Sequence, residues 1–379
     1  MTDPLPPLDR AALEQLRGEL DGIDAELVRL VARRQETIQA IGKVKATAGR
    51  ETRDYQREKV VLDRGAALAQ DAGLEPSLAV NVLRTLIQYS LMRQEQDRLQ
   101  TSSVGSGKTA LVIGGLGRIG RWFVSFMASQ GYGVSVVDPA VDETTQARFR
   151  SLEESGVAYD VIIVAATLQS SVTVLEQLRA LRPAGLIFDV GSLKSPLRAA
   201  LQGLADDGLK VTSVHPMFGP STQLLAGRQV IFVDVGCGQA TAEARALFAA
   251  TMATSVDMNI DEHDKVIAVV LGLSHFTGIA FVDALAGSGV SAEALSNLAS
   301  PTYTAMVNLG RTIVHENPDL YYEIQRYNDF GGEPLRSLAD SVARLQRAVD
   351  DGDQTLFVDA MLAGREFLVA SDRRRDRAD

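Results

Sequence analysis

The sequence has 379 residues, of which 46% are hydrophobic and 23% charged, as is typical of soluble globular proteins. Since this length exceeds what one compact core holds, two or three domains are expected. The net charge of −10 argues against nucleic acid as the main partner, and the single cysteine, Cys237, excludes an intrachain disulfide and a cysteine-based zinc site. We find no apolar run long enough to cross a bilayer and no signal-peptide pattern, so we expect a cytoplasmic protein without membrane partner or metal.

Residues 1–100 predict a helical domain. Apolar side chains recur at helical spacing from residue 9 to about 46, a length of roughly 55 Å at 1.5 Å per residue. Two more helical patterns follow, at 55–72 and from 77 to about 100. An apolar stripe of this length cannot be buried within a small domain of one chain. We therefore expect the three helices to form a bundle with a second copy of the chain.

Polar residues on these helices share particular faces. Arg34 and Lys45 are eleven positions apart, about three turns, and project from one face. Arg17 lies about a quarter turn out of phase with Arg34. Ser90 and Gln94 are one turn apart on the third helix and can touch the same object. On composition alone, a solvated charged face is the simplest interpretation.

The segments 13–24, Ala32-Arg-Arg, Gly42-Lys-Val-Lys45 and Asp54-Tyr-Gln-Arg-Glu58 resemble the all-helical, intertwined-dimer chorismate mutase family over about residues 9–98. The resemblance implies arginines that clamp the substrate carboxylates, Arg17 reaching into the partner's site, and Lys45 and Gln94 that donate to the ether oxygen. Because the rearrangement of chorismate is intramolecular, it needs no nucleophile or general base. The implied catalytic set comprises Arg17, Arg34, Lys45, Asp54, Arg57, Glu58, Ser90 and Gln94.

Residues 101–108 are rich in serine and glycine and predict a linker. The stretch TALVIGGLGRIG at 109–120 then predicts a strand, a glycine turn and a helix N-terminus. In this G-x-G-x-x-G pattern Gly115 allows the tight turn, Gly117 the approach of a pyrophosphate, and Gly120 close packing. The next strand ends in Asp138, which would bind the ribose and repel a 2′-phosphate, so NAD is predicted. The expected cofactor contacts are Gly115, Leu116, Gly117, Arg118, Ile119, Gly120 and Asp138.

Alternating strands and helices continue this domain over residues 109–260. Strands are predicted at 161–165, 186–190 and 211–214, with helices around 172–181 and 196–204, which indicates a doubly wound, mostly parallel Rossmann sheet. Loops at the carboxyl ends of such strands bind ligands. A histidine in that position, as in His215-Pro-Met-Phe-Gly219, can act as an acid or base, or can be satisfied by loop backbone.

The motifs Asp189–Lys194, His215–Gly219, Glu262–Asp264, Gly272–His275 and Gly310–Arg311 resemble the prephenate dehydrogenase family over about residues 109–330. The resemblance implies that His215 is the catalytic histidine and that Ser192 orients the substrate hydroxyl or the nicotinamide. Arg311 would bind the ring carboxylate, His275 would line the substrate pocket and Lys194 would contact the cofactor. Relatives of the bifunctional type often carry a second arginine where Thr304 stands here. Arg326 or the other subunit is therefore the candidate partner of the pyruvyl carboxylate.

Residues 261–379 predict a helical dimerisation and substrate domain. Helices are expected at 266–285, 292–298, 301–314, 318–327 and 335–367. We interpret Tyr303, Tyr321 and Tyr322 as packing aromatics, and His263 as a residue that caps or bonds within a helix. The predicted fold class is thus an all-α mutase domain, an α/β Rossmann domain and an all-α dimerisation domain.

We predict a bifunctional enzyme that rearranges chorismate to prephenate and oxidises prephenate to 4-hydroxyphenylpyruvate with NAD. Three alternatives stay open: an arogenate dehydrogenase, a catalytically dead mutase-like segment that regulates or dimerises, and a 2- or 3-hydroxyacid dehydrogenase, which would leave the N-terminal segment unexplained. A homodimer is expected, and tyrosine is a candidate feedback inhibitor, as in enzymes of tyrosine biosynthesis.

Overall fold

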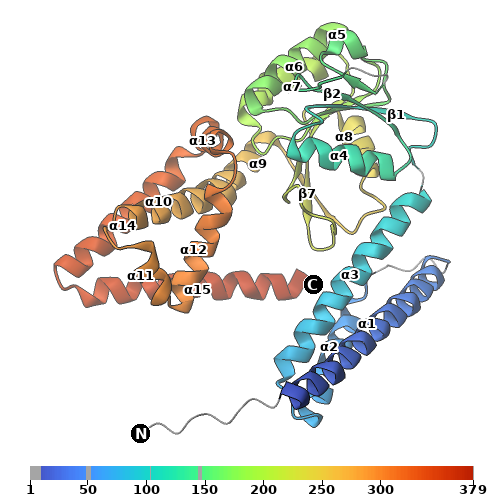
Figure 1. Cartoon of the computed structure of the whole chain (residues 1–379). Coiled ribbons are helices and arrows are strands. Elements are labelled where there is room, and N and C mark those ends of the chain that lie inside the picture. The colour runs from blue at the N-terminus through green and yellow to red at the C-terminus, as the bar shows by residue number, and fades with distance from the viewer. Residues whose placement is uncertain (1–9, 48–52, 103, 144–146, 379) are drawn as a thin grey trace, which may run out of the picture.

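The computed structural model describes residues 10–47, 53–102, 104–143 and 147–378. It has three parts: an N-terminal group of helices, a sheet domain and a C-terminal group of helices (Figure 1). The fold class predicted from the sequence is confirmed. The third N-terminal helix continues to Ser102, two residues into the predicted linker, and the first strand begins at Thr109; the last strand is followed at once by the C-terminal helices (Figure 1).

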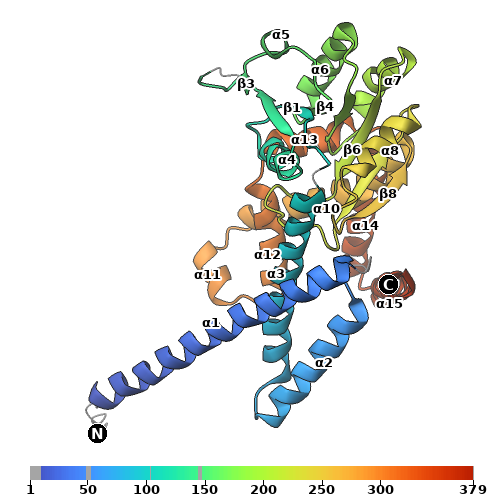
Figure 2. The same ribbon diagram turned by 90° about the vertical axis from the view of Figure 1, so that its right-hand side faces the viewer.

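The N-terminal part consists of α1 (Arg10–Thr47), α2 (Tyr55–Asp71) and α3 (Pro76–Ser102). Asp54 caps α2, because its carboxylate accepts from the Arg57 backbone N–H at 2.9 Å. Helix α1 extends well beyond the other two (Figure 2). Its apolar stripe is largely uncovered within one chain, since these side chains are 54–61% exposed: Leu16, Leu20, Ile23, Leu27 and Leu30.

The sheet has eight strands in the order β3-β2-β1-β4-β5-β6-β7-β8. All neighbours are parallel except β6 and β7, which run antiparallel. The strand order reverses between β1 and β4, and ligands of doubly wound sheets bind at the carboxyl ends of strands beside this switch point. The strands are β1 (Thr109–Ile113), β2 (Gly133–Val137), β3 (Arg148–Phe149), β4 (Val161–Val164), β5 (Leu186–Asp189), β6 (Val211–Pro216), β7 (Gln229–Val233) and β8 (Thr254–Met258).

Helices cover both faces of the sheet. Side chains of α4 (Arg118–Ser129) and α8 (Gly238–Ala246) join one buried cluster, in which the Phe123 and Phe188 rings meet edge to face. Side chains of α6 (Leu168–Leu181) and α7 (Arg198–Asp206) join the cluster on the opposite face. These two apolar layers hold the strand ends, and thus the loops that carry the candidate site, in place. Two short helices, α5 (Leu152–Ser155) and η1 (Ser195–Leu197), complete the domain.

The C-terminal part is helical, as predicted: α9 (Ile260–Ile267), a π-helical segment η2 (Ala268–Leu273), α10 (Ser274–Ala286), α11 (Ala292–Asn297), α12 (Pro301–Val314), α13 (Pro318–Tyr327), α14 (Gly332–Asp350) and α15 (Gln354–Ala378). One helix expected at 335–367 is in fact two. Gly352, with φ of +69°, lies in the turn between α14 and α15, which pack together.

The continuous helical stretch Ile260–Ala286 is long and apolar enough to cross a membrane, with a mean hydropathy of 1.9. Our expectation that the chain contains no such run was therefore wrong. In this fold the stretch packs against α12, α13 and α14, and only 22% of its apolar window is buried within one chain. Its composition suits a helix that is covered by other protein.

Candidate active sites

The loop between β1 and α4 is the predicted nucleotide cradle. Gly114 adopts a φ of +78°, and a Cβ there would lie 2.6 Å from the Ala165 carbonyl oxygen. The tight turn that we assigned to Gly115 therefore falls on Gly114. Added Cβ atoms would also clash at Gly115, 2.7 Å from Val136 Cγ1, and at Gly120, 2.1 Å from the Gly114 oxygen. Gly117 is the N-cap of α4, so this loop and helix terminus fit a pyrophosphate.

Asp138 lies beside this turn at the end of β2. Its Oδ2 accepts from the Leu116 backbone N–H at 3.0 Å, and its Oδ1 accepts from the Ala140 N–H at 3.0 Å. The carboxylate is thus held where the ribose of a dinucleotide lies in this fold. Arg118, in the first turn of α4, is exposed and pairs with Glu316 at the end of α12. This ion pair joins the nucleotide domain to the C-terminal helices.

His215 stands at the end of β6, only 3% exposed, and forms a chain of ring contacts. Its Nδ1 lies 2.8 Å from Nε2 of His263, and Nδ1 of His263 lies 2.6 Å from Oδ1 of Asp264. His263 and Asp264 come from the start of α9, which a capping box of Asn259 and Glu262 begins. As expected, His263 bonds within its helix, to Asp264, and it also bridges the catalytic candidate to that carboxylate.

Burial controls the protonation of the hydrogen-bonded side chains from His215 to Asp264. Burial, together with the charges of His263 and Lys194, holds the pKa of His215 well below its ordinary value. Burial likewise lowers the pKa of His263. For Asp264, burial acts to raise the pKa, but hydrogen bonds from His263 and Ser195 outweigh it and the pKa is lowered. The arrangement therefore favours two neutral imidazoles beside one carboxylate.

The loop after β5 is held by a fully buried ion pair. Lys194 Nζ lies 2.7 Å from Asp189 Oδ2 and donates to the Val214 carbonyl at 3.0 Å. The Asp264 carboxylate accepts from the Lys194 backbone N–H at 3.0 Å and from Ser195. This corrects our assignment of Lys194 to the cofactor, because its ammonium is completely enclosed. Ser192 is half-buried in the loop that this pair secures.

Two further predicted residues, His275 and Arg311, lie on the C-terminal helices, and their described contacts are within that part. His275 on α10 lies 4.5 Å, centroid to centroid, from the ring of Tyr321 on α13, so Tyr321 packs against a candidate site residue. Burial lowers the pKa of His275, and among the described residues its buried Nδ1 has no hydrogen-bond partner. Arg311 on α12 is exposed and makes only a long contact, 3.4 Å, with Asn308 among the described side chains.

The π-helical segment separates the two histidine-bearing helices α9 and α10. Gln325 on α13 donates its side-chain N–H to the Gly272 carbonyl in this segment at 2.8 Å. Such bulges occur often at functional sites, because they change the direction in which later side chains point. Here the segment sets the rotation of His275 relative to His263.

In the N-terminal helices, Arg34 and Ser90 meet between α1 and α3. Arg34 Nη1 donates to Ser90 Oγ at 3.1 Å and to the Leu86 carbonyl at 3.3 Å. No carboxylate pairs with Arg34 in the described part of the chain, and burial lowers its pKa. Ser90 Oγ also lies 2.8 Å from Oε1 of Gln35, whose buried Nε2 has no partner among the described residues. We did not single out Gln35 from the sequence.

The other predicted residues of this domain are distributed more widely. Gln94 is buried and donates to the Ile38 carbonyl at 3.1 Å, and Lys45 is half-buried near the end of α1. Glu58 receives two hydrogen bonds from Arg53, at 2.9 and 3.2 Å, and Arg53 lies over the Tyr55 ring. The structure thus adds Arg53 to the predicted set. The side chains of Arg17, Asp54 and Arg57 are exposed in the single chain.

The described residues include no cluster of three or more histidine, cysteine, aspartate or glutamate side chains that could hold a metal ion. One site offers a neutral histidine at the same carboxyl edge of the sheet as a dinucleotide cradle. The other offers cations and amides between helices.

Three family models match the chain in succession. Residues 16–95 match chorismate mutase type II, residues 135–255 match the nucleotide-binding domain of prephenate dehydrogenase, and residues 259–363 match its dimerisation domain. The T-protein of Enterobacter agglomerans is 26% identical over 349 residues, 92% of this chain and 91% of that protein. The intracellular chorismate mutase of Mycobacterium tuberculosis is 36% identical over 83 residues, 22% of this chain and 71% of that protein.

Among solved structures, the prephenate dehydrogenase of A. aeolicus in complex with hydroxyphenyl propionate and NAD+ is similar with a TM-score of 0.55. It is 16% identical and the match covers 72% of this chain and 98% of that one, which shows a shared fold. The mutase match precedes the two dehydrogenase matches on one chain, and the T-protein match spans all three. The chain therefore belongs to the bifunctional family that joins a type II chorismate mutase to a prephenate dehydrogenase.

Proposed function

We propose that the N-terminal helices rearrange chorismate to prephenate and that the two following domains oxidise and decarboxylate prephenate with NAD. The observation that carries the oxidative half is the chain from His215 through His263 to Asp264, at the same carboxyl edge of the sheet as the glycine cradle. The observation that supports the mutase half is the pocket of Arg34, which lacks a carboxylate partner in the described residues, beside the unpartnered amide of Gln35.

For the mutase reaction the site needs to hold a dianion in a compact conformer and to stabilise charge on its ether oxygen. Arg34 supplies a half-buried cation for one carboxylate, and Ser90 a hydroxyl beside it. Lys45 and Gln94 are assigned to the ether oxygen, Gln94 by exchanging its bond to the Ile38 carbonyl. Glu58, oriented by Arg53, is assigned to the substrate hydroxyl. Asp54 contributes by starting the helix that carries Arg57 and Glu58.

For the oxidation, hydrogen bonding assigns the tautomer of His215. The Asp264 carboxylate can only accept, so the neutral His263 carries its proton on Nδ1 and its Nε2 is an acceptor. Nδ1 of His215 must then donate to His263, which leaves the lone pair of His215 on Nε2. Nε2 is therefore the base that accepts the substrate hydroxyl proton. The same logic positions the histidine of a hydrolytic triad.

NAD, which the glycine turn and Asp138 would hold, would supply the acceptor for the hydride of the carbinol carbon. As the hydride leaves, the hydroxyl proton passes to Nε2 of His215. The bond to the ring carboxylate breaks, carbon dioxide departs and the bonding electrons complete the aromatic ring. Arg311, whose guanidinium is exposed on α12, is assigned to that carboxylate, and His275 to the substrate pocket. Ser192 is assigned to the hydroxyl or the nicotinamide edge.

We also propose a homodimer. The uncovered stripe of α1 and the low burial of the stretch 260–286 both supply apolar surface that a second copy would cover. Arg17, exposed on α1, would then reach the mutase site of the partner. A cytoplasmic location and feedback inhibition by tyrosine stay predictions, and tyrosine would be tested by adding it to the assay below.

The test is NADH production by the full-length protein, first with prephenate and then with chorismate alone. We expect signal with both substrates. Arg34→Ala should lower the rate of NADH formation from chorismate by about a hundredfold or more, because charge-assisted bonds to a substrate carboxylate are lost. The rate with prephenate should not change. His215→Asn should lower both signals by about a thousandfold.

Each other outcome has a definite meaning. Signal with prephenate but none with chorismate would make the N-terminal helices a scaffold. Activity with arogenate and none with prephenate would overturn the substrate assignment. Full prephenate activity in His215→Asn would remove the histidine chain from the mechanism.

A further inference from the structure

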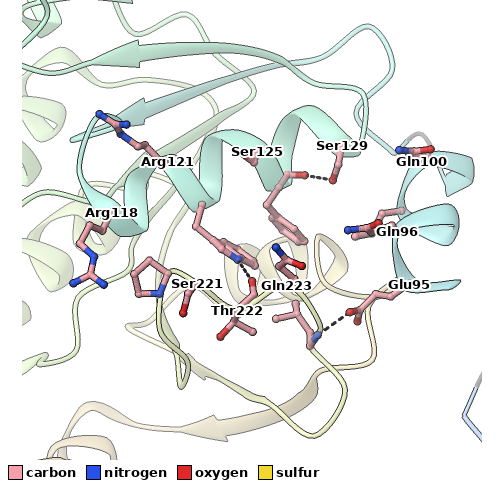
Figure 3. A pocket seen from close by; sticks show the side chains of 15 residues that line it. Glu95, Gln96, Gln100, Arg118, Arg121, Ser125, Ser129, Ser221, Thr222 and Gln223 are labelled. Carbon is pink, nitrogen blue, oxygen red and sulfur yellow. Dashed lines mark hydrogen bonds between the residues drawn. The ribbon is translucent and has the colours of Figure 1, made fainter. Parts of the chain in front are cut away.

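Helix α3 belongs to both halves of the molecule. Its residues Ser90 and Gln94 face α1 in the proposed mutase site, and the next residue, Glu95, points into the nucleotide-binding domain and is only 2% exposed. Figure 3 shows Glu95 at one end of a groove of about 870 Å³. The walls of this groove are α3, α4 and the loop between β6 and β7 (Figure 3).

The Glu95 carboxylate accepts backbone hydrogen bonds from two separate segments of the nucleotide-binding domain. Oε2 accepts from the Leu225 N–H at 2.7 Å, in the β6–β7 loop, and Oε1 accepts from the Met252 N–H at 2.5 Å, in the turn before β8. Burial raises the pKa of Glu95, while these two N–H groups and the charge of Arg98 act in the opposite direction. The backbone N–H groups of Leu225 and Met252 lie outside the strands, so both depend on one side chain of the mutase domain for a hydrogen-bond acceptor.

The β6–β7 loop begins at the catalytic histidine. Met217 and Phe218 follow Pro216, the last residue of β6, and the Phe218 ring lies 4.9 Å from the ring of Trp122 on α4. The Trp122 indole N–H donates to the Thr222 carbonyl at 2.8 Å in the middle of the loop. Glu95 holds the far end of the loop at Leu225. The loop is therefore fixed at its start by the sheet, in its middle by α4 and at its end by α3.

We propose that Glu95 is a positioning residue for the dehydrogenase that the mutase domain supplies. It acts through the β6–β7 loop and does not touch the reacting atoms. Gln94 and Glu95 are consecutive on one helix. The position of α3 that places Gln94 in the proposed mutase site therefore also fixes the position of the β6–β7 loop, which follows His215. The two active sites of the chain are thus joined mechanically through α3.

The test replaces the carboxylate with an amide in the full-length protein, as Glu95→Gln. Asp97→Asn, which makes the same change at an exposed position two residues along α3, is the matched control. We expect kcat/KM for prephenate to fall about tenfold in Glu95→Gln, mainly through a higher KM, since the amide offers only one acceptor. The pH profile of kcat should not move, because the chain from His215 to Asp264 is untouched. The control should match the unmodified protein in both.

Amide hydrogen exchange provides a second measurement, which does not depend on activity. In the unmodified protein the N–H groups of Leu225 and Met252 should exchange slowly although they lie in loops, and in Glu95→Gln both should exchange at least tenfold faster. Rapid exchange of both amides in the unmodified protein would overturn the proposal. So would unchanged dehydrogenase kinetics in a folded Glu95→Gln, or an equal loss in Asp97→Asn.

Discussion

The two active regions are built in opposite ways. The dehydrogenase site lies where the carboxyl ends of β5 and β6 meet α9. Its central side chains are buried within one chain and at most 3% exposed: His215, His263, Asp264, Lys194 and Asp189. The proposed mutase site lies between α1 and α3, and the apolar stripe of α1 is more than half exposed. A base must be held in one tautomer, which a buried network achieves, whereas a dianion needs only well-placed cations and amides.

This difference predicts which changes each half tolerates. The dehydrogenase should be sensitive to any break in its internal network and less sensitive than the mutase to loss of the contact between α1 helices. The mutase should be sensitive to loss of the second copy and tolerant of changes away from its few donors. Four predictions test the comparison, beginning with the largest expected effect.

Lys194→Met should destabilise the protein by about 3–5 kcal/mol, because the Asp189 carboxylate would be left buried without its partner. Urea denaturation of the sheet domain measures this. Lys210→Met is the control, since Lys210 pairs with Glu243 at the surface and its loss should cost at most about 1 kcal/mol. Equal effects of the two changes would show that the buried pair is not a special support of the site.

Leu20→Glu combined with Leu27→Glu should separate the mutase bundle from its partner. These leucines are 56% and 54% exposed in one chain, so the change costs little in the monomer and much in a dimer. We expect mutase activity at micromolar protein to fall about a hundredfold, with a smaller loss of dehydrogenase activity. Glu26→Gln on the same helix is the control. Unchanged mutase activity and sedimentation would contradict the proposed homodimer.

Asp264→Asn should lower kcat of the dehydrogenase by about ten- to a hundredfold. An amide no longer enforces the proton on Nδ1 of His263, so His215 loses its fixed tautomer. NADH formation from prephenate measures this, while the mutase should be unaffected. Asp261→Asn, which removes an exposed carboxylate paired with Arg198 on the same helix, provides the comparison. Equal losses of kcat in the two variants would show that any change in α9 lowers the rate and that the Asp264 carboxylate has no specific role.

The smallest expected effect is the dependence of the free energy of unfolding on pH. His215 and His263 are buried and their pKa values are lowered, so below about pH 6.5 the unfolded chain binds protons that the folded chain does not. The free energy of unfolding should therefore fall as pH falls, by up to about 1.4 kcal/mol per pH unit for each histidine. Unfolding curves at pH 7.5 and 5.5 measure this, and a shallower dependence is expected in His263→Gln. A stability that rises on acidification would contradict neutral imidazoles.

Local pattern predicted much of the molecule. The helices α1, α2 and α3, the glycine turn with Asp138, and strands β4, β5 and β6 were located from periodicity and motif spacing. These features depend on neighbours in sequence, since helical spacing and the G-x-G-x-x-G turn are local properties. The prediction missed strands β7 and β8, whose short apolar runs follow an irregular loop, and merged α14 with α15 across Gly352.

The pairings within the sites were decided only by the tertiary structure. His215 and His263 are 48 residues apart, and Lys194 and Asp264 are 70 apart, so spacing cannot tell that they meet. The same holds for Glu95, which meets Leu225 across 130 residues and a domain boundary. By itself the sequence determined which residues have the right chemistry and on which elements they lie. Packing of the two apolar layers and of α3 and α9 against them decided which ones touch, because contacts between distant segments depend on the whole fold.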